Sequence, residues 1–282
     1  MDPRGLGETR QPTATEHGIL GPPHPGFRLD RADCSPDLAG LLERHWLTGW
    51  ELPDGDSGEV TLLPHPCVNL VFDAGVVMVA GVGRERFSYR YRGRGRVFGV
   101  KFRPGAFLPF LREPVTRITD GYLPLASLWG PQEAAALAGD LAVAPDLEAL
   151  AAVAETHLRA HWPAPDPEVA RVGEIVQALL HDRSITQVKD VAERFGLSPR
   201  SLQRLFHRYV GVTPKWVLQR YRLQEAAWRL AEAGPDEPWA RVAVELGYFD
   251  QSHFIRDFTR AVGQPPGAYA QACAAGRRPL RV

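Results

Sequence analysis

Cysteine is scarce in this sequence, and long hydrophobic runs are absent. The three cysteines, Cys34, Cys67 and Cys273, are odd in number and far apart, so we expect neither a disulfide framework nor a Cys-x-x-Cys metal motif. No run of 18 or more apolar residues occurs, and the first residues lack an apolar stretch, so we expect neither a transmembrane helix nor a signal peptide. These absences favour a protein of the reducing cytoplasm.

The chain as a whole also has no net charge, but its acidic and basic residues are unevenly distributed. The 282 residues include 33 Lys+Arg and 33 Asp+Glu, for a formal charge of zero. Residues 165–282 hold 17 Lys+Arg against 13 Asp+Glu, a net charge of +4, which leaves −4 on residues 1–164. The length suggests about two domains, and a basic domain beside an acidic one suits a DNA reader joined to a control domain.

The first fifty residues are predicted to form a tail and a short helix. Residues 1–26 are rich in Gly, Pro and charge without periodicity, and we expect a disordered tail there. Residues 35–50 have apolar or aromatic side chains at helical spacing, which predicts a short helix. These side chains are Leu38, Leu41, Leu42, His45 and Trp46.

Residues 58–103 are predicted to be strands. Apolar and polar side chains alternate there, and the Asp73-Ala74-Gly75 and Gly93-Arg94-Gly95 segments interrupt them as turns. Val76 to Val82 is a continuous apolar run, as in a buried strand. Short strands separated by tight turns indicate an antiparallel sheet or barrel.

Helical patterns and one proline-rich stretch divide the rest of the chain. Residues 131–161 are rich in Ala and Leu and are predicted to be helical. The Pro-Ala-Pro-Asp-Pro stretch at 163–167 disfavours helix and sheet interiors, so we place a linker there. This division gives a regulatory domain at 27–162, an all-helical domain at 168–272 and a tail at 273–282.

One sequence pattern occurs twice in the helical domain. Each copy is a short helix, a glycine turn, a helix with an arginine face and a glycine stop, as in a helix-turn-helix unit. At a shift of 52, Ser198, Leu202, Arg204, Phe206, Arg208, Gly211 and Pro214 correspond to Asp250, Phe254, Arg256, Phe258, Arg260, Gly263 and Pro266. At a shift of 51, Val188, Val191, Ala192 and Gly196 correspond to Trp239, Val242, Ala243 and Gly247, so the second turn has one extra residue.

The second helix of each copy has the composition of a DNA-recognition helix. Its apolar face would be buried, while arginine and glutamine side chains on the other face could bind guanine, adenine or phosphates. The candidate DNA-binding residues are Ser198, Arg200, Ser201, Gln203, Arg204, His207 and Arg208 in the first copy, and Gln251, Ser252, His253, Arg256 and Arg260 in the second. Asp257 is an acidic exception on the second helix, and Asp250 is expected to cap it.

Residues 167–272 resemble the DNA-binding domain of AraC/XylS-type bacterial transcription regulators. The matching segments run from Val191 to Phe206 and from Gly247 to Phe258, with the closing Gly263-Gln264-Pro265-Pro266. The resemblance implies two three-helix subdomains joined by a long central helix, with recognition helices in successive major grooves. By motif position, Arg200, Gln203 and Arg204 would face one groove, and Gln251, Ser252 and Arg256 the next. Trp239 and Asp257 depart from the family pattern, which implies weaker contact by the second helix.

The N-terminal domain is harder to interpret. The segments Leu63–Phe72 and Gly99–Phe107 are similar to an uncharacterised module found on a subset of AraC-type regulators. His65 and Cys67 are good zinc ligands, but two close ligands are too few for a metal site, so we expect no metal or cofactor. The segment Arg90–Arg96 has two interpretations. It is either an arginine-glycine motif that binds nucleic acid or, as we favour, a hairpin with arginines on its solvent-exposed face.

The sequence therefore predicts an α+β protein with a mainly β N-terminal domain and an all-α C-terminal domain with two helix-turn-helix units joined by a long helix. We expect a transcription regulator that is not an enzyme, with double-stranded DNA as its partner. Further candidate partners are a small-molecule effector, RNA polymerase and a second copy of the chain. We expect no membrane partner. A DNA-repair or metal-dependent enzyme domain fused to the DNA reader, and an adaptor that senses nothing, stay as alternatives.

Overall fold

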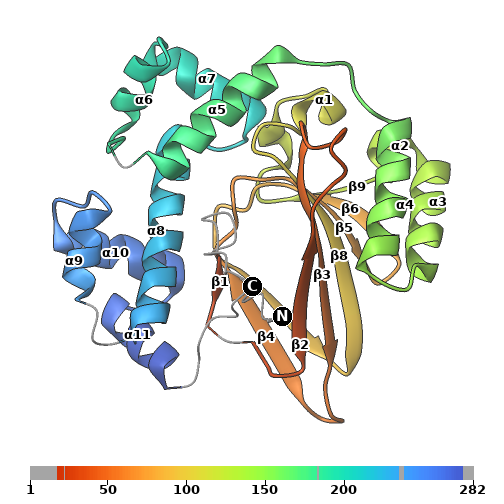
Figure 1. Cartoon of the computed structure of the whole chain (residues 1–282), viewed down its shortest axis with the longest axis horizontal. Helices are drawn as coiled ribbons and strands as arrows, with labels where there is room; N and C mark the ends of the chain where they lie inside the picture. Colours follow the sequence, from red (N-terminus) through yellow and green to blue (C-terminus); the bar gives the residue numbers. More distant parts are fainter. Residues whose placement is uncertain (1–17, 22, 183, 235–237, 276–282) are drawn as a thin grey trace, which may run out of the picture.

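The N-terminal half of the chain is built on two antiparallel sheets (Figure 1). The computed structural model describes residues 18–21, 23–182, 184–234 and 238–275. The strands in these ranges are β1 (Ile19–Leu20), β2 (Phe27–Ala32), β3 (Leu42–Glu51), β4 (Ser57–Leu62), β5 (Asn69–Asp73), β6 (Val76–Ala80), β7 (Phe87–Arg92), β8 (Arg94–Phe102) and β9 (Tyr122–Pro124). The larger sheet has the order β2-β3-β8-β5-β6-β9, and the smaller has the order β1-β4-β7.

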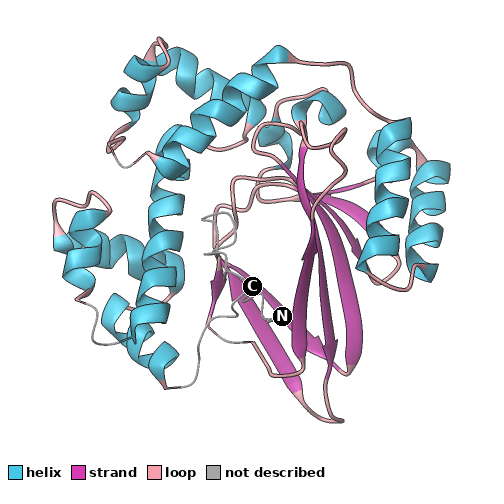
Figure 2. Ribbon diagram, in the orientation of Figure 1, coloured by secondary structure: helices cyan, strands magenta, loops and turns pink. Residues whose placement is uncertain are grey.

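Helices cover one face of the larger sheet (Figure 2). The helices of this half are α1 (Leu108–Leu111), the 3-10 helix η1 (Val115–Ile118), α2 (Ala126–Trp129), α3 (Pro131–Val143) and α4 (Leu147–Ala160). Helices α3 and α4 pack on the sheet through residues that are at most 1% exposed, Leu137, Leu141, Leu150 and Leu158. The predicted helical segment at 131–161 is therefore confirmed as two helices with Asp146 capping the second.

The C-terminal half is helical throughout, as predicted. Its helices are α5 (Pro167–His181), α6 (Val188–Arg194), α7 (Pro199–Tyr209), α8 (Pro214–Ala233), α9 (Trp239–Glu245), α10 (Gln251–Val262) and α11 (Pro266–Ala274). Within the described ranges, no helix is both long and apolar enough to cross a bilayer. The fold class is therefore confirmed as a mainly β domain followed by an all-α domain.

The predicted helix at 35–50 is wrong. Residues 42–51 form β3, which lies between β2 and β8 and pairs with both, so that Trp46 is opposite Arg31 on one side and Gly99 on the other. Pairing on both sides of β3 outweighs a helical spacing that extends over only two turns. Trp46 and Trp50 lie across Gly99 and Gly95 of β8, where an added Cβ would come within 2.4 Å of the indole rings.

Two further local predictions need correction. Residues 1–17 of the expected tail lie outside the described residues, but Ile19–Leu20 pair with β4 as strand β1, because the unpaired edge of β4 accepts them. Gly93 does not close a hairpin: β7 pairs with β4 while β8 pairs with β3, so the chain crosses between sheets at this residue. The predicted turn at Asp73-Ala74-Gly75 is confirmed, with positive φ at Ala74 and Gly75.

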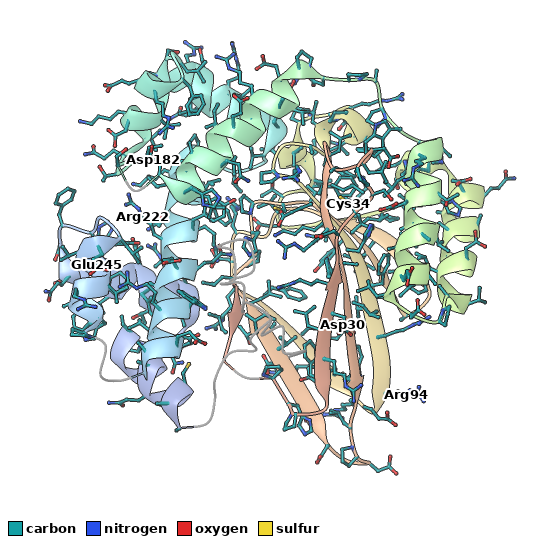
Figure 3. The ribbon with its side chains drawn as sticks, in the orientation of Figure 1. Asp30, Cys34, Arg94, Asp182, Arg222 and Glu245 are labelled. Carbon is teal, nitrogen blue, oxygen red and sulfur yellow. The ribbon has the colours of Figure 1, made fainter. Side chains whose placement is uncertain are left out.

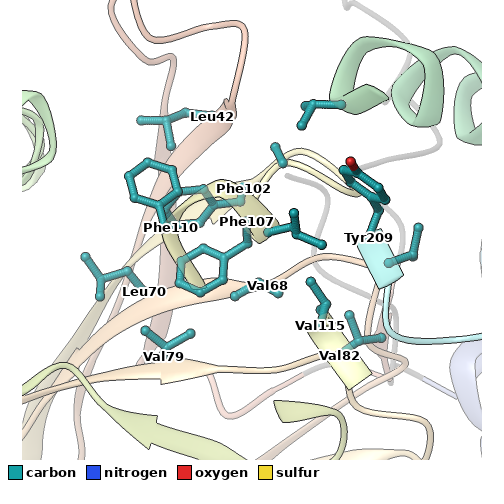
Figure 4. Close-up of a cluster of buried hydrophobic side chains, with 14 of the residues drawn as sticks. Leu42, Val68, Leu70, Val79, Val82, Phe102, Phe107, Phe110, Val115 and Tyr209 are labelled. Carbon is teal, nitrogen blue, oxygen red and sulfur yellow. The ribbon is translucent and has the colours of Figure 1, made fainter. Parts of the chain in front are cut away.

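The two halves share one apolar core. A single cluster of buried side chains extends from Val79 and Phe107 of the N-terminal half to Val172 and Tyr209 of the helical half. Figure 4 shows Tyr209 at the side of this cluster, and its helix α7 contacts η1 of the N-terminal half. The coil that follows α4 therefore joins domains that are packed together over a common apolar surface.

His157 links α3 and α4 through two carboxylates. Its Nδ1 lies 2.7 Å from Oε1 of Glu133 and its Nε2 lies 3.0 Å from Oδ2 of Asp140. Partial burial alone would lower the pKa of His157, but hydrogen bonds to Asp140 and Glu133 outweigh burial and raise that pKa above its usual value. The contacts therefore favour the imidazolium form.

We expect His157→Gln to destabilise the protein in a pH-dependent way. Because the folded-state pKa is raised, the stabilisation is fully present below the unfolded pKa of about 6.5 and is lost as pH rises through the folded value. The difference in unfolding free energy between wild type and variant should therefore be larger at acidic than at alkaline pH. Urea unfolding at a series of pH values measures it, and a difference that grows with pH would contradict the assignment.

Candidate nucleic-acid interface

The first helix-turn-helix unit consists of α6, a glycine turn and α7. Asp190 accepts hydrogen bonds from the backbone N–H groups of Thr186 and Gln187, which fixes the start of α6. Gly196 has φ +61°, a left-handed conformation that favours glycine and reverses the chain between the helices. Ser198 caps α7 by accepting a hydrogen bond from the backbone N–H of Ser201 at 3.1 Å.

Helix α7 buries one face and exposes the other. Leu202 and Phe206 are fully buried and Tyr209 is 7% exposed. The exposed side chains are Arg200, Gln203, Arg204, His207 and Arg208. Ser198 is exposed and Ser201 is half-buried, and their hydroxyls are 2.9 Å apart, so both take part in the cap. The outward face of α7 has no acidic side chain.

The second unit repeats this arrangement with α9 and α10. Gly247 forms the turn at φ +79°, and Asp250 caps α10 by accepting a hydrogen bond from the N–H of Ser252 at 2.8 Å. Trp239 stacks on the ring of Phe254 with 14° between the planes, so this departure from the family pattern is accommodated by packing. The exposed side chains on α10 are Gln251, Ser252, His253, Arg256 and Arg260.

Asp257 lies on the buried face of α10, which contradicts its interpretation as an acidic exception on the DNA-facing surface. Its side chain is 2% exposed and accepts a hydrogen bond from the amide of Gln219 on α8. The same carboxylate lies 3.1 Å from Nε2 of His253 and 2.5 Å from Nη2 of Arg260. Asp257 therefore holds α10 on α8 and orients two of the predicted DNA-binding side chains.

Helix α8 joins the two units. Its 20 residues correspond to about 30 Å of helix, close to the ~34 Å of one turn of B-DNA. Arg222 in the middle of α8 donates hydrogen bonds to the carbonyls of Ile185 and Thr186, and Gly247 lies against its guanidinium. Figure 3 shows Arg222 between the two units. The units are therefore held on one helix by direct contacts.

The N-terminal domain contacts the first unit and the central helix. Thr119 donates a hydrogen bond to the carbonyl of Gly211, directly after α7, at 2.8 Å. The buried amide of Gln224 on α8 donates to the carbonyl of Leu63 at 2.8 Å. Gly105 lies so close to α5 that an added Cβ would come within 2.5 Å of Val172.

The loop between β6 and β7 reaches the second unit. Arg86 donates a hydrogen bond to the carbonyl of Val262 at the end of α10, at 2.7 Å. Arg220 on α8 stacks on Trp216 and donates to the carbonyl of Arg84 in the same loop. Sequence reasoning missed these contacts, because nothing in the local pattern of Arg84 or Arg86 indicates a partner more than 130 positions away.

His65 and Cys67 do not form a metal site with other side chains of the described residues. Across those residues, no group of three or more His, Cys, Asp and Glu side chains is arranged to hold a metal ion. Cys67 is 4% exposed, and burial raises the pKa of its thiol to about 12. The ring of His65 packs against Tyr221 of α8. Such a thiol stays protonated at neutral pH, unlike a reactive or zinc-bound cysteine.

Both parts of the chain match known protein families. Residues 191–272 match a helix-turn-helix domain, and residues 30–124 match a domain of unknown function, DUF6597. The HTH-type transcriptional activator RhaS of Pectobacterium carotovorum is 37% identical over 76 residues, which cover 27% of this chain and 26% of that protein. The transcriptional activator NphR of a Rhodococcus species is 34% identical over 102 residues, or 36% of this chain and 29% of that protein.

These matches span only about a quarter to a third of each relative's length. Among solved structures, ToxT from Vibrio cholerae bound to (E)-4-(8-methylnaphthalen-1-yl)but-3-enoic acid aligns over 88% of this chain and 99% of that chain. Its TM-score is 0.41 at 11% identity. The resemblance of the C-terminal domain to the AraC-type DNA-binding domain, and of the N-terminal domain to an uncharacterised module, is confirmed by the sequence matches.

Proposed function

We propose that this chain is a sequence-specific DNA-binding transcription regulator that reads two successive major grooves with α7 and α10. The observation that carries the proposal is the pair of outward helix faces, each with exposed arginine and glutamine and neither with an exposed acidic side chain beyond the capping residue Asp250. A 20-residue helix, about 30 Å long, joins the two units. The similarity of this domain to transcriptional activators agrees with the proposal.

Within this proposal, the side chains have two roles. Arg200, Gln203 and Arg204 on α7 bind base edges or phosphates in one groove, because residues near the start of a recognition helix approach the bases. Residues nearer the helix end contact phosphates, which fixes orientation without reading sequence. The base-contacting set on α10 is Gln251, Ser252 and Arg256. The phosphate-contacting set near the helix ends is His207, Arg208 and Arg260. Ser198 and Ser201 present the start of α7, and His253 lies beside the base-contacting set near the start of α10.

The N-terminal domain controls how the two units are presented. Its contacts at Gly211, Gln224 and Val262 support this role, because they tie one domain to the first unit, the central helix and the second unit. A cavity of about 310 Å³ opens between β4, β7 and α11, and its lining includes Arg86 and Tyr269. We propose this cavity as the effector site. Thermal unfolding with a panel of metabolites tests whether an effector binds, because a ligand that binds the folded state raises Tm.

The proposal has further parts. We propose that the chain divides at the 163–167 linker, that the protein is cytoplasmic, that it forms a dimer and that it contacts RNA polymerase. The coil preceding α5 supports the linker: Asp166 caps α5 and accepts a hydrogen bond from the hydroxyl of Tyr209 at 2.8 Å. An enzymatic domain has less support, since the relatives are transcriptional activators and the buried Cys67 is unsuited to alkyl transfer.

We expect Arg204→Ala and Arg208→Ala to weaken DNA binding in different ways. Loss of a base contact by Arg204 should cost about 1–3 kcal/mol on the preferred sequence and relax specificity at that position. Loss of a phosphate contact by Arg208 should weaken all sequences alike and reduce the salt slope by about one. Binding of the full-length protein to sites chosen by in vitro selection, measured at several salt concentrations, separates the two. Equal, salt-independent affinity for both variants and wild type would contradict the proposal.

A further inference from the structure

Phe249 is exposed to a degree that no packing role explains. At 92% exposure it is the most exposed large hydrophobic side chain of the described residues. It lies in the turn between α9 and α10, directly before Asp250, whose carboxylate is used in capping α10. Exposed aromatic surface gains free energy when a partner covers it. The side chain is therefore accessible for a contact outside the chain.

The internal repeat shows that Phe249 is surplus to the fold of its unit. In the first unit, the turn runs Gly196-Leu197-Ser198, and Leu197 packs against the core. In the second unit, Tyr248 has the buried position, at 8% exposure, with its ring edge-on to Phe254 at 5.1 Å. Phe249 is the one residue by which the second turn exceeds the first. Its insertion adds an apolar side chain to the surface without adding to the core.

We propose that Phe249 contacts the C5-methyl group of a thymine in the major groove read by α10. This inference rests on the proposed function and names one determinant of its specificity. Among the groups on base edges in the major groove, the thymine methyl is the apolar one, and phenylalanine is among the side chains that contact it. The turn before a recognition helix lies at the rim of the groove, since the first residues of the helix approach the bases.

The surroundings of Phe249 favour DNA as the partner. The next exposed side chains along α10 are Gln251, Ser252, His253 and Arg256, which donate hydrogen bonds or carry positive charge. Asp257, the carboxylate within α10, faces inward at 2% exposure. A surface with this charge complements the phosphates on either side of a groove. The apolar ring would then be covered by the groove wall while the neighbouring cations bind phosphates.

A thermodynamic cycle between protein and base tests the inference. Full-length wild type first selects its preferred sites in vitro, and each thymine of the half-site bound by α10 is then replaced by deoxyuridine, which lacks only the methyl group. We expect Phe249→Ala to weaken binding about tenfold, and one deoxyuridine to weaken wild type about fourfold, the equivalent of one buried methyl. That deoxyuridine should leave the affinity of Phe249→Ala unchanged. The variant Tyr122→Ala, which removes a 60% exposed aromatic from β9, should bind as wild type does.

Each alternative result has a distinct meaning. Equal affinity of Phe249→Ala and wild type for the selected sites would overturn the inference and leave the proposed function intact, with a protein partner as the next candidate. A loss of affinity in Phe249→Ala without coupling to any deoxyuridine would also overturn the thymine assignment. If wild type selected no sequence at all, the proposed function itself would fail and the inference with it. Thermal unfolding of Phe249→Ala and Tyr122→Ala checks that both variants are as stable as wild type.

Discussion

Gly211→Ala is expected to reduce the free energy of unfolding by roughly 3 kcal/mol, because it adds strain and a steric clash at the domain interface. Gly211 has φ +88°, and the left-handed conformation costs an alanine about 1–2 kcal/mol. The added Cβ would lie 2.7 Å from Oγ1 of Thr119 and 3.0 Å from Cγ1 of Val115. Overpacking of this kind costs about 1–3 kcal/mol. Urea unfolding of the full-length protein measures the total.

Gly196→Ala is the matched control for this variant. Gly196 also has positive φ, at +61°, but an added Cβ there has open space around it. It should therefore cost only the conformational part, about 1–2 kcal/mol. The difference in unfolding free energy between the two variants measures the contact of the N-terminal domain with the end of α7. Equal losses would mean that Thr119 and Val115 do not press on Gly211 in solution.

Asp257→Ala is expected to destabilise the protein by about 2–3 kcal/mol and to loosen α10 from α8. The change leaves the amide of Gln219 without its acceptor and removes the carboxylate that holds His253 and Arg260. A buried polar group left unpaired costs about 1–3 kcal/mol, and more when charge is involved. Asp257→Asn should recover part of the loss, because its amide oxygen can still accept from Gln219.

The effect of Asp257→Ala on DNA binding should be confined to one half-site. Because Asp257 positions α10 and not α7, base substitutions in the half-site read by α10 should matter less to the variant, while those in the other half-site keep their effect. Asp250→Ala is the control, since loss of the cap should cost only about 1 kcal/mol. A variant as stable as wild type would show that this carboxylate faces solvent, as the sequence first suggested.

The position of Asp257 could have been found in the sequence. Phe254, Asp257, Phe258 and Ala261 follow the i, i+3, i+4, i+7 spacing of one helix face, so the carboxylate belongs to the buried side. Our prediction treated it as an acidic exception on the second helix, although a charged side chain can be buried where it is paired. The same spacing correctly predicted the exposed sets on α7 and α10. Periodicity was thus a better guide than residue type.

The misassigned helix at 35–50 has a different cause. Leu38 and Leu42 are both buried and joined by a backbone hydrogen bond, so the helical spacing reflects one real turn. Beyond this turn, Trp46, Thr48 and Trp50 occupy every second position, as on one face of a strand, and β3 extends through them. The strand prevails because β3 pairs with β2 and β8, and these pairs join residues up to 60 positions apart, such as Leu42 and Phe102. Contacts of that range are not contained in a local window of sequence.

The shared core has a consequence for how such proteins can be recombined. Val115 and Thr119 of one domain pack against the end of the other domain's recognition helix, and Arg86 binds the end of the second. A chimera that exchanged the N-terminal domain at the proline-rich coil would set an unrelated surface against Tyr209 and Gly211. A functional hybrid therefore has to transplant the facing side chains along with the domain.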